Sequence, residues 1–189
     1  STYVGHPLAK DLPTEINKED LKKDFDFSLE KKIIAILPGS RKSEIVYHDK
    51  ALVEFIKFYK EENPDTLIVL ALNKESDLQG GLKEISKEIE VVFANTQNVL
   101  AACDLAIVAS GTATLEAAIL SKPMVVIYKS NFFSNFILSN FFLKTKFISL
   151  PNILSQEKII FELRQNQVTG REIYKKTIIT LRNKKDISD

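Results

Sequence analysis

The chain has 189 residues, and 26 Lys and Arg against 25 Asp and Glu leave a net charge of +1. This balance gives no overall electrostatic footprint for nucleic acid, and a hydrophobic content of 44% excludes a disordered chain. A single cysteine, Cys103, excludes a disulfide framework within the chain and suits a reducing compartment. We expect one domain, because a chain of this length buries enough apolar surface to fold without disulfide bonds or a metal.

Short apolar runs alternate with helical segments along most of the chain. We expect strands at residues 33–37, 67–72, 91–93, 104–109 and 124–128, with helices at 43–60, 82–89, 98–102 and 113–120. Strands that are apolar on both faces and alternate with helices predict a parallel sheet that is covered on both sides. The expected fold class is therefore α/β, a Rossmann-like doubly wound parallel sheet.

The regions outside this alternation have a different pattern. Residues 11–31 are charged and poorly patterned, which favours a surface connection with one short helix. Residues 157–165 and 171–181 have a helical pattern, so we expect a helical tail over about 155–189. The longest apolar run, 131–143, is interrupted by Asn and Ser and is shorter than the roughly 20 apolar residues that span a bilayer.

The first strand-to-helix turn, LPGSRKSE at residues 37–44, is a candidate phosphate site. Gly39 permits a tight backbone path, and Arg41 places a forked cation at the carboxyl end of a strand. Exposed backbone N–H groups beside an arginine suit a phosphate group. The alternative is a turn in which Ser40 caps the following helix and Arg41 is solvated; the local pattern favours it.

The second turn, ASGTATLEAA at residues 109–118, joins small residues to a carboxylate. Ser110, Gly111 and Thr112 let a ligand approach the backbone closely, and Glu116 lies about one helical turn beyond Thr112. A carboxylate there is placed to accept hydrogen bonds from the hydroxyls of a sugar or ribose. The same residues also fit a capping-box-like helix start, and the two interpretations are compatible.

Other chemistry-bearing patterns are weak in this sequence. The GxGxxG and GxxxxGK[ST] fingerprints, a Ser-His-Asp or Cys-His set and a metal-ligand cluster are all absent from it. Asn152, in SLPN, fits an ordinary turn residue, and His6 fits a structural hydrogen-bonder. Cys103 fits a small buried apolar residue.

Four motifs occur together in this order: YVGHPLAK at 3–10, LPGSRKSEI at 37–45, ASGTATLEAAILSKPMVVIYK at 109–129 and SLPNIL at 149–154. This set closely resembles the C-terminal half of lipid-A-disaccharide synthase, an inverting glycosyltransferase of the GT-B fold. The resemblance runs from about residue 3 to residue 170. One such motif is weak evidence, but four in register, SLPN included, are fairly specific.

The resemblance implies a reaction in lipid A biosynthesis and a donor site. The family transfers 2,3-diacylglucosamine from UDP-2,3-diacylglucosamine to 2,3-diacylglucosamine 1-phosphate and releases UDP. Carried onto this sequence, the donor UDP-binding residues are Gly39, Ser40, Arg41, Ser110, Gly111, Thr112, Glu116 and Asn152. No metal and no cofactor are expected, because helix N-termini and Arg41 can neutralise the leaving UDP.

The resemblance also implies what this chain does not carry. The family's enzymes are much longer, so residues 1–189 are expected to form a single nucleotide-sugar-binding domain, without the N-terminal domain that supplies acceptor site and general base. The catalytic residues therefore stay unknown, and this chain alone should be inactive. The family's C-terminal tail is expected to exchange between the subunits of a homodimer, and the short tail here leaves monomer and dimer open.

Two other functions and a membrane contact remain open at this stage. Another GT-B UDP-sugar enzyme, such as a UDP-N-acetylglucosamine 2-epimerase, and a non-catalytic nucleotide-binding module both fit the turns. Residues 131–147 hold six of the 12 phenylalanines with lysines beside them, which fits burial or contact with a membrane surface. We expect a cytoplasmic location, peripheral on the inner face of the inner membrane, and no nucleic-acid partner.

Overall fold

A computed structural model of the chain describes residues 17–130 and 147–188. His6 and residues 131–146, for which burial and contact with a membrane surface were both left open above, lie outside the described residues. Within the described part, no helix is both long enough and apolar enough to cross a membrane.

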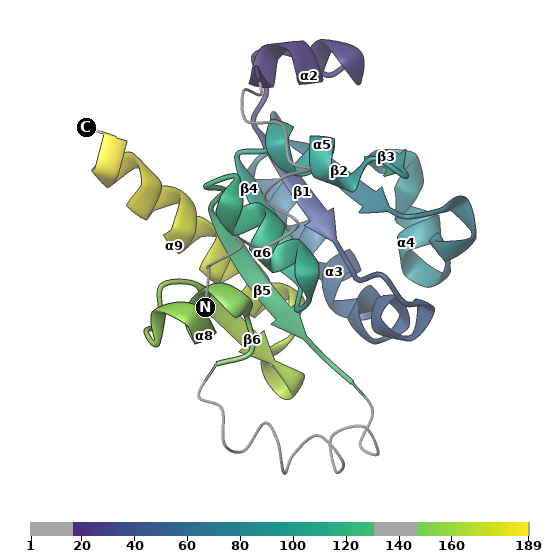
Figure 1. Cartoon of the computed structure of the whole chain (residues 1–189). Coiled ribbons are helices and arrows are strands. Elements are labelled where there is room, and N and C mark those ends of the chain that lie inside the picture. The colour runs from purple at the N-terminus through teal and green to yellow at the C-terminus, as the bar shows by residue number, and fades with distance from the viewer. Residues whose placement is uncertain (1–16, 131–146, 189) are drawn as a thin grey trace, which may run out of the picture.

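One six-stranded parallel sheet forms the centre of the molecule, in the order β3-β2-β1-β4-β5-β6 (Figure 1). The strands are β1 (Ile33–Leu37), β2 (Leu67–Leu72), β3 (Glu90–Phe93), β4 (Leu105–Ala109), β5 (Met124–Tyr128) and β6 (Phe161–Arg164). The chain reverses direction across the sheet between β1 and β4, which pair with Ile34 opposite Leu105. This order is the doubly wound arrangement, in which ligands bind beyond the carboxyl ends of the strands where the order reverses.

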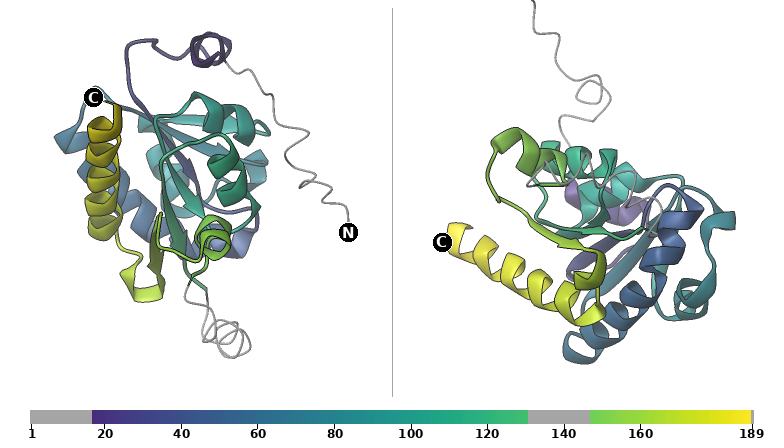
Figure 2. Two further views of the ribbon diagram at one scale, coloured as in Figure 1. Left: turned by 60° about the vertical axis from the view of Figure 1, so that its left-hand side comes forward. Right: turned by 90° about the horizontal axis from the view of Figure 1, so that it is seen from below.

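Helices cover both faces of the sheet (Figure 2). They are α2 (Lys18–Asp24), α3 (Lys42–Glu62), α4 (Gly80–Ile85), α5 (Thr96–Ala102), α6 (Thr112–Ile119), α8 (Leu150–Ser155) and α9 (Gly170–Ser188). Short 3₁₀ turns follow β2, α4 and β6, at Glu75–Asp77, Ser86–Glu88 and Gln165–Gln167. Helices α3, α4 and α9 pack on one face, whereas α5, α6 and the segment before α8 pack on the other.

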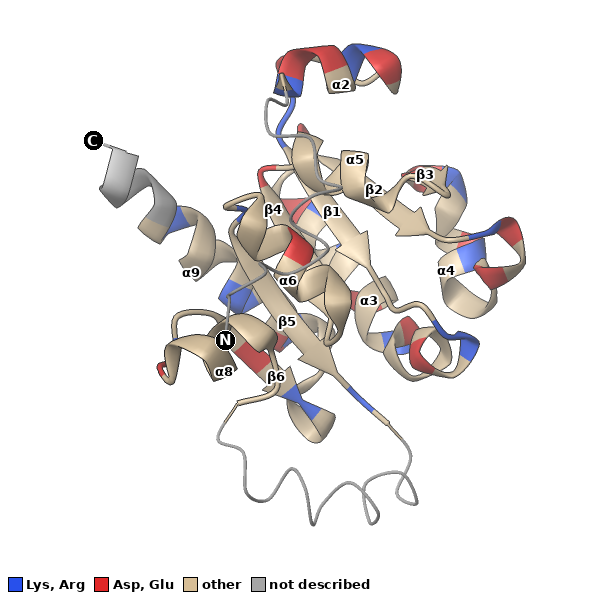
Figure 3. Cartoon of the chain, in the orientation of Figure 1, with Lys and Arg blue, Asp and Glu red and all other residues tan. Residues whose placement is uncertain are grey.

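The alternation within β1 shows why the strands are apolar throughout. Ile34 and Ile36 pack in the core beneath α3, and Ile33, Ala35 and Leu37 pack in the core beneath α5 and α6. All five residues are buried, as the unbroken apolar run predicts. Strands β1, β2, β4 and β5 carry no charged residue, and the charges of Figure 3 lie on the helices, the turns and the two edge strands β3 and β6.

The C-terminal region differs from the predicted helical tail. The predicted helix at 157–165 is wrong: residues 161–164 form β6, an edge strand whose Phe161 and Leu163 lie opposite Val125 and Ile127 of β5. A segment of four residues, FELR, is too short for its own pattern to separate a strand from a helix, and here pairing with β5 decides. The helix predicted at 171–181 is confirmed as α9, and it continues to Ser188.

Candidate functional site

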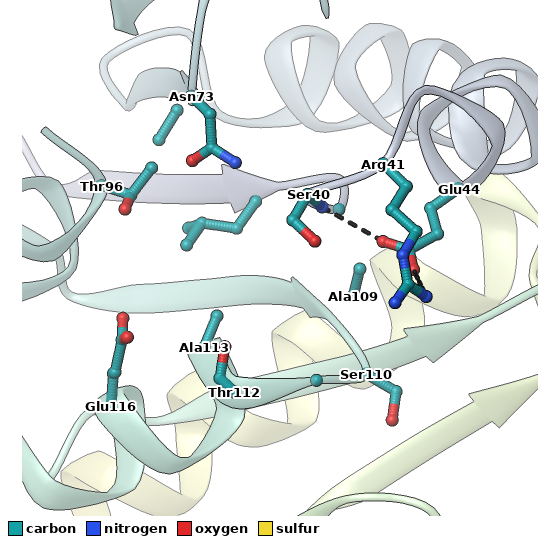
Figure 4. Close-up of a pocket in the computed structure, with 14 residues that line it drawn as sticks. Ser40, Arg41, Glu44, Asn73, Thr96, Ala109, Ser110, Thr112, Ala113 and Glu116 are labelled. Atoms are coloured by element: carbon teal, nitrogen blue, oxygen red, sulfur yellow. Dashed lines mark hydrogen bonds and ion pairs between the residues drawn. The ribbon is translucent and has the colours of Figure 1, made fainter. Parts of the chain in front are cut away.

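A cleft of about 380 Å³ opens at the carboxyl ends of β1, β2 and β4 (Figure 4). Both turns singled out in the sequence line it. The lining residues are Leu37, Gly39, Ser40, Arg41, Glu44, Ala71, Asn73, Thr96, Ala109, Ser110, Gly111, Thr112, Ala113 and Glu116. The structure thus brings seven of the eight predicted donor residues together, from segments about 70 residues apart, because β1 and β4 are neighbours in the sheet.

The first turn is built around Gly39 and Glu44. Gly39 has a φ of +135°, and a Cβ there would lie 2.6 Å from a carboxylate oxygen of Glu44. That carboxylate accepts a hydrogen bond from the Ser40 N–H at 3.1 Å and contacts the Arg41 guanidinium at 3.5 Å. The predicted cap by Ser40 is therefore wrong: Arg41 occupies the N-cap position of α3, and Glu44 reaches back from the first turn.

Among the described residues that line the cleft, Arg41 is the one cation. Its side chain is 80% exposed and forms an ion pair with Glu44, which is held by the turn itself. An ion pair so exposed contributes little to folding stability, typically about 0–1 kcal/mol. The guanidinium therefore lies at the cleft although the stability of the fold hardly depends on it. Its fork of N–H donors matches the oxygens of a phosphate or diphosphate group.

The second turn presents the N-terminus of α6 to the cleft. Gly111 occupies the N-cap position in extended backbone, and none of the described side chains caps the helix. The predicted capping box is wrong, because the N-cap residue is a glycine, which has no side chain to accept from the helix N–H groups. The Thr114 hydroxyl donates to the Gly111 carbonyl at 2.7 Å. An uncapped helix start directs backbone N–H groups and positive potential toward the cleft, which favours an anion there.

The two ends of the cleft differ in chemistry (Figure 4). Arg41 and Ser110 lie at one end, whereas Asn73, Thr96 and Glu116 lie toward the other. One end thus holds Arg41, paired with Glu44, and the other holds neutral hydrogen-bonding groups with the carboxylate of Glu116. This polarity fits a ligand with an anionic group and a polar, hydroxyl-bearing body.

Asn152 is the predicted site residue that the structure does not bring to the cleft lining. Its side chain is fully buried in α8. Its amide nitrogen donates to the Ile160 carbonyl and to the Glu162 carboxylate, both at 2.9 Å, and its oxygen accepts from the N–H groups of Ile159 and Ile160. The Asn152 side chain therefore holds α8 against the segment that leads into β6. This role uses both the NH₂ group and the oxygen of the amide.

Sequence reasoning did not single out Asn73, Thr96, Glu44 or His48. Asn73 directly follows β2 and Thr96 begins α5, so the rule that ligands bind beyond strand ends could have found both. For Glu44, the sequence pattern indicated only an acidic residue in the first turn of α3. His48 carried no signal, because its role depends on contact with a backbone group 81 residues away.

His48 joins two strand ends beneath the first turn. Its side chain is buried, Nδ1 lies 2.7 Å from the Pro38 carbonyl, and Nε2 lies 3.1 Å from the Lys129 nitrogen. A backbone N–H can only donate, so Nε2 accepts from Lys129 and Nδ1–H donates to Pro38. The ring therefore holds the turn at the end of β1 against the end of β5 only in its neutral form.

This arrangement predicts a stability that falls as the pH falls. Burial lowers the pKa of His48 below its ordinary value of 6.5. Below about pH 6.5 the unfolded chain binds the proton and the folded chain resists it, so the free energy of unfolding falls by up to about 1.4 kcal/mol per pH unit. Urea denaturation at several pH values between 8 and 5 should show a weaker pH dependence for His48→Gln than for wild type. Equal slopes would contradict the assignment.

Comparisons with known proteins agree with this architecture. A model of the lipid-A-disaccharide synthetase family matches residues 1–189. A lipid-A-disaccharide synthase from Colwellia psychrerythraea is 37% identical over 177 residues, covering 91% of this chain and 45% of that protein. One from Nitrosococcus oceani is 35% identical over 185 residues, covering 96% and 48%. The chain thus spans about half the length of these relatives.

Solved structures share the fold at low identity. The Escherichia coli ADP-heptose lps heptosyltransferase II superposes with a TM-score of 0.64 at 15% identity, over 93% of this chain and 57% of that one. A UDP-GlcNAc 2-epimerase from Neisseria meningitidis gives 0.56 at 12% identity, over 85% and 40%. These likenesses show the fold alone, the Rossmann-like fold of GT-B glycosyltransferases. With the family match over its whole length, the chain belongs to the lipid-A-disaccharide synthetase family.

Proposed function

We propose that this chain is the donor-binding half of a lipid-A-disaccharide synthase. That enzyme transfers 2,3-diacylglucosamine from UDP to 2,3-diacylglucosamine 1-phosphate and releases UDP, as an inverting hexosyltransferase in lipid A biosynthesis. The observation that carries the proposal is the cleft, in which Arg41 and the uncapped start of α6 meet at the reversal point of the sheet.

The donor's diphosphate fits the Arg41 end of the cleft. Arg41 supplies a charged fork, and the start of α6 at Gly111 and Thr112 supplies backbone N–H groups. As the sugar transfers, negative charge builds up on the departing UDP. Donors that are already in place at that position stabilise this charge without rearrangement, so no metal is required for this part of the reaction.

The nucleoside fits the other end. Glu116 lies one turn into α6, where its carboxylate can accept hydrogen bonds from the ribose hydroxyls. Asn73 carries both a donor and an acceptor, which complements the alternating groups on the edge of uracil, and Thr96 adds a hydroxyl. We propose these residues as the ribose and base contacts of UDP.

The described residues offer no group that we assign as the base for the acceptor hydroxyl. An inverting displacement needs one to take the proton as the sugar bond forms. We therefore propose that the acceptor site and the base are supplied by a domain outside these 189 residues, which span about half the length of the relatives. These 189 residues alone should bind UDP but should not cleave UDP from the sugar donor. When the N-terminal half of a family member is added, UDP should be released.

Two alternatives predict other results in the same assay. A UDP-N-acetylglucosamine 2-epimerase would act on UDP-N-acetylglucosamine and would not require the lipid acceptor for turnover. A non-catalytic module would bind UDP and stay inactive with any added half. The cleft by itself fits all three, and the family match favours the synthase.

Both proposed substrates carry acyl chains, so we propose that the enzyme works from the cytoplasm at a membrane surface. Of the phenylalanine-rich stretch 131–147, residues 131–146 are the proposed contact, because Phe147 is buried in the fold. Co-sedimentation with anionic vesicles tests it, with a Phe133→Ser, Phe136→Ser double variant as the control. Wild type that stays in the supernatant while folded would contradict the contact.

A further inference from the structure

A buried carboxylate lies behind the cleft, in the strand that the sequence pattern did not reveal. The side chain of Glu162 on β6 is 5% exposed and does not line the cleft. Leu163 packs in the core on the α9 side, and the alternation of a strand therefore turns Glu162 to the opposite face, toward α8.

Glu162 collects hydrogen bonds from the segment that leads into α8. It accepts from the Ile148 N–H at 3.0 Å, the Ser149 N–H at 2.8 Å and the Ser149 hydroxyl at 2.6 Å. Asn152 and Arg164 each donate to it at 2.9 Å. Burial would raise the pKa of Glu162, but the bonds from Ser149, Arg164 and Ile148 outweigh it and hold the pKa below its usual value.

The same segment contacts the cleft on its other side. The Ile148 carbonyl accepts a hydrogen bond from the Ser110 hydroxyl at 3.0 Å. Ser110 lines the cleft and immediately precedes Gly111, the N-cap of α6. A single residue, Ile148, is therefore held by Glu162 through its N–H and holds the turn before α6 through its carbonyl.

We propose that Glu162 is a positioning residue for the anion end of the cleft. It fixes Ile148, which fixes Ser110 and with it the direction of the first N–H groups of α6. The inference rests on the proposed function only in naming UDP as the ligand. Contiguous hydrogen bonds of this kind can carry coupling between sites, and their coupling is measurable by paired substitutions.

The substitution Glu162→Gln tests this role with little change in size. A carboxylate accepts at both oxygens, whereas an amide accepts at one atom and donates at the other. Its NH₂ group would face an N–H of Ile148 or Ser149, or the Arg164 guanidinium, so the segment must shift. Asp104→Asn is the matched control, because Asp104 accepts from the Ile33 N–H at the amino ends of the strands, away from the cleft.

Calorimetric titration with UDP should show about tenfold weaker binding for Glu162→Gln, a size typical of coupling through residues that do not contact the ligand. Asp104→Asn should bind within about twofold of wild type. Ser110→Ala should also weaken binding, and Glu162→Gln should cost little more in the Ser110→Ala background, because both act through Ile148. Fully additive losses, or wild-type affinity in Glu162→Gln, would overturn the inference.

A measurement without ligand separates this inference from the proposed function. The backbone amide resonance of Gly111 should shift in Glu162→Gln and stay in place in Asp104→Asn. If wild type binds no UDP, the proposed function fails, and an unmoved Gly111 resonance would still overturn the positioning role. Ser149→Ala, which removes one donor to Glu162, serves if Glu162→Gln does not fold, and it should move the same resonance.

Discussion

Replacement of Arg41 with alanine should weaken UDP binding by about 1.5–3 kcal/mol, the contribution of a charge-assisted hydrogen bond. The loss should leave the fold intact, because the side chain is 80% exposed and its partner is a residue three positions along the same turn. Calorimetric titration measures the affinity, and urea denaturation measures the free energy of unfolding. An unchanged affinity would contradict the assignment and leave Arg41 as a solvated surface cation.

Two further variants make the Arg41 result specific. Arg171→Ala removes the same charge from the start of α9, outside the cleft lining, and should leave the UDP affinity unchanged. Arg41→Lys keeps the charge and loses the fork, so it should recover only part of the affinity. Equal losses in the Arg41 and Arg171 variants would mean that net charge alone, and no local contact, attracts the nucleotide.

Replacement of Gly111 with valine should reduce UDP binding by at least about 2.7 kcal/mol, a hundredfold. Gly111 lines the cleft, and a Cβ built there meets nothing within 4 Å. Its φ of 166° is extended backbone that any residue adopts, so the variant should fold. The added side chain would instead occupy the space where a phosphate approaches the start of α6.

A graded series distinguishes this blocking effect from unfolding. Gly111→Ala should lower the affinity less than Gly111→Val, since the smaller side chain fills less of the cleft. Circular dichroism should show the same folded spectrum for both. A folded valine variant with wild-type affinity would contradict an anion site at this helix start, and an unfolded one would contradict the open space around the residue.

The central sheet could be predicted from the sequence because its strands are buried on both faces. Residues 33–37 and 67–72 are unbroken apolar runs, and each forms a strand with the predicted bounds. Strand β6 could not be predicted in this way, since Glu162 and Arg164 interrupt its apolar residues and it pairs with β5 alone. Residues 161–164 are recognised as a strand only from their pairing with β5, a contact between segments that are far apart in the sequence.

Some residues of the cleft could also be predicted from the sequence, and others could not. Arg41 and Gly111 were identifiable because their turns follow strong strand patterns, and parallel topology brings such turns together. Local capping was predicted wrongly at both turns, because Arg41 and not Ser40 occupies the N-cap position of α3, and Gly111, which has no side chain, occupies that of α6. A local sequence pattern does not fix the exact residue at which a helix begins. Glu162 and His48 act through segments far away in the chain, which no local pattern contains.

The most direct test of the donor-site proposal is thermal unfolding of this chain with UDP, with ADP and without ligand. At a UDP concentration of about 100 times its dissociation constant, binding should stabilise the fold by about 2.7 kcal/mol. For a domain of this size that corresponds to a rise in the melting temperature of roughly 5–10 °C. ADP at the same concentration should give a clearly smaller rise. A folded chain whose melting temperature does not change with UDP, or changes equally with ADP, would contradict the proposal that the cleft is a UDP donor site.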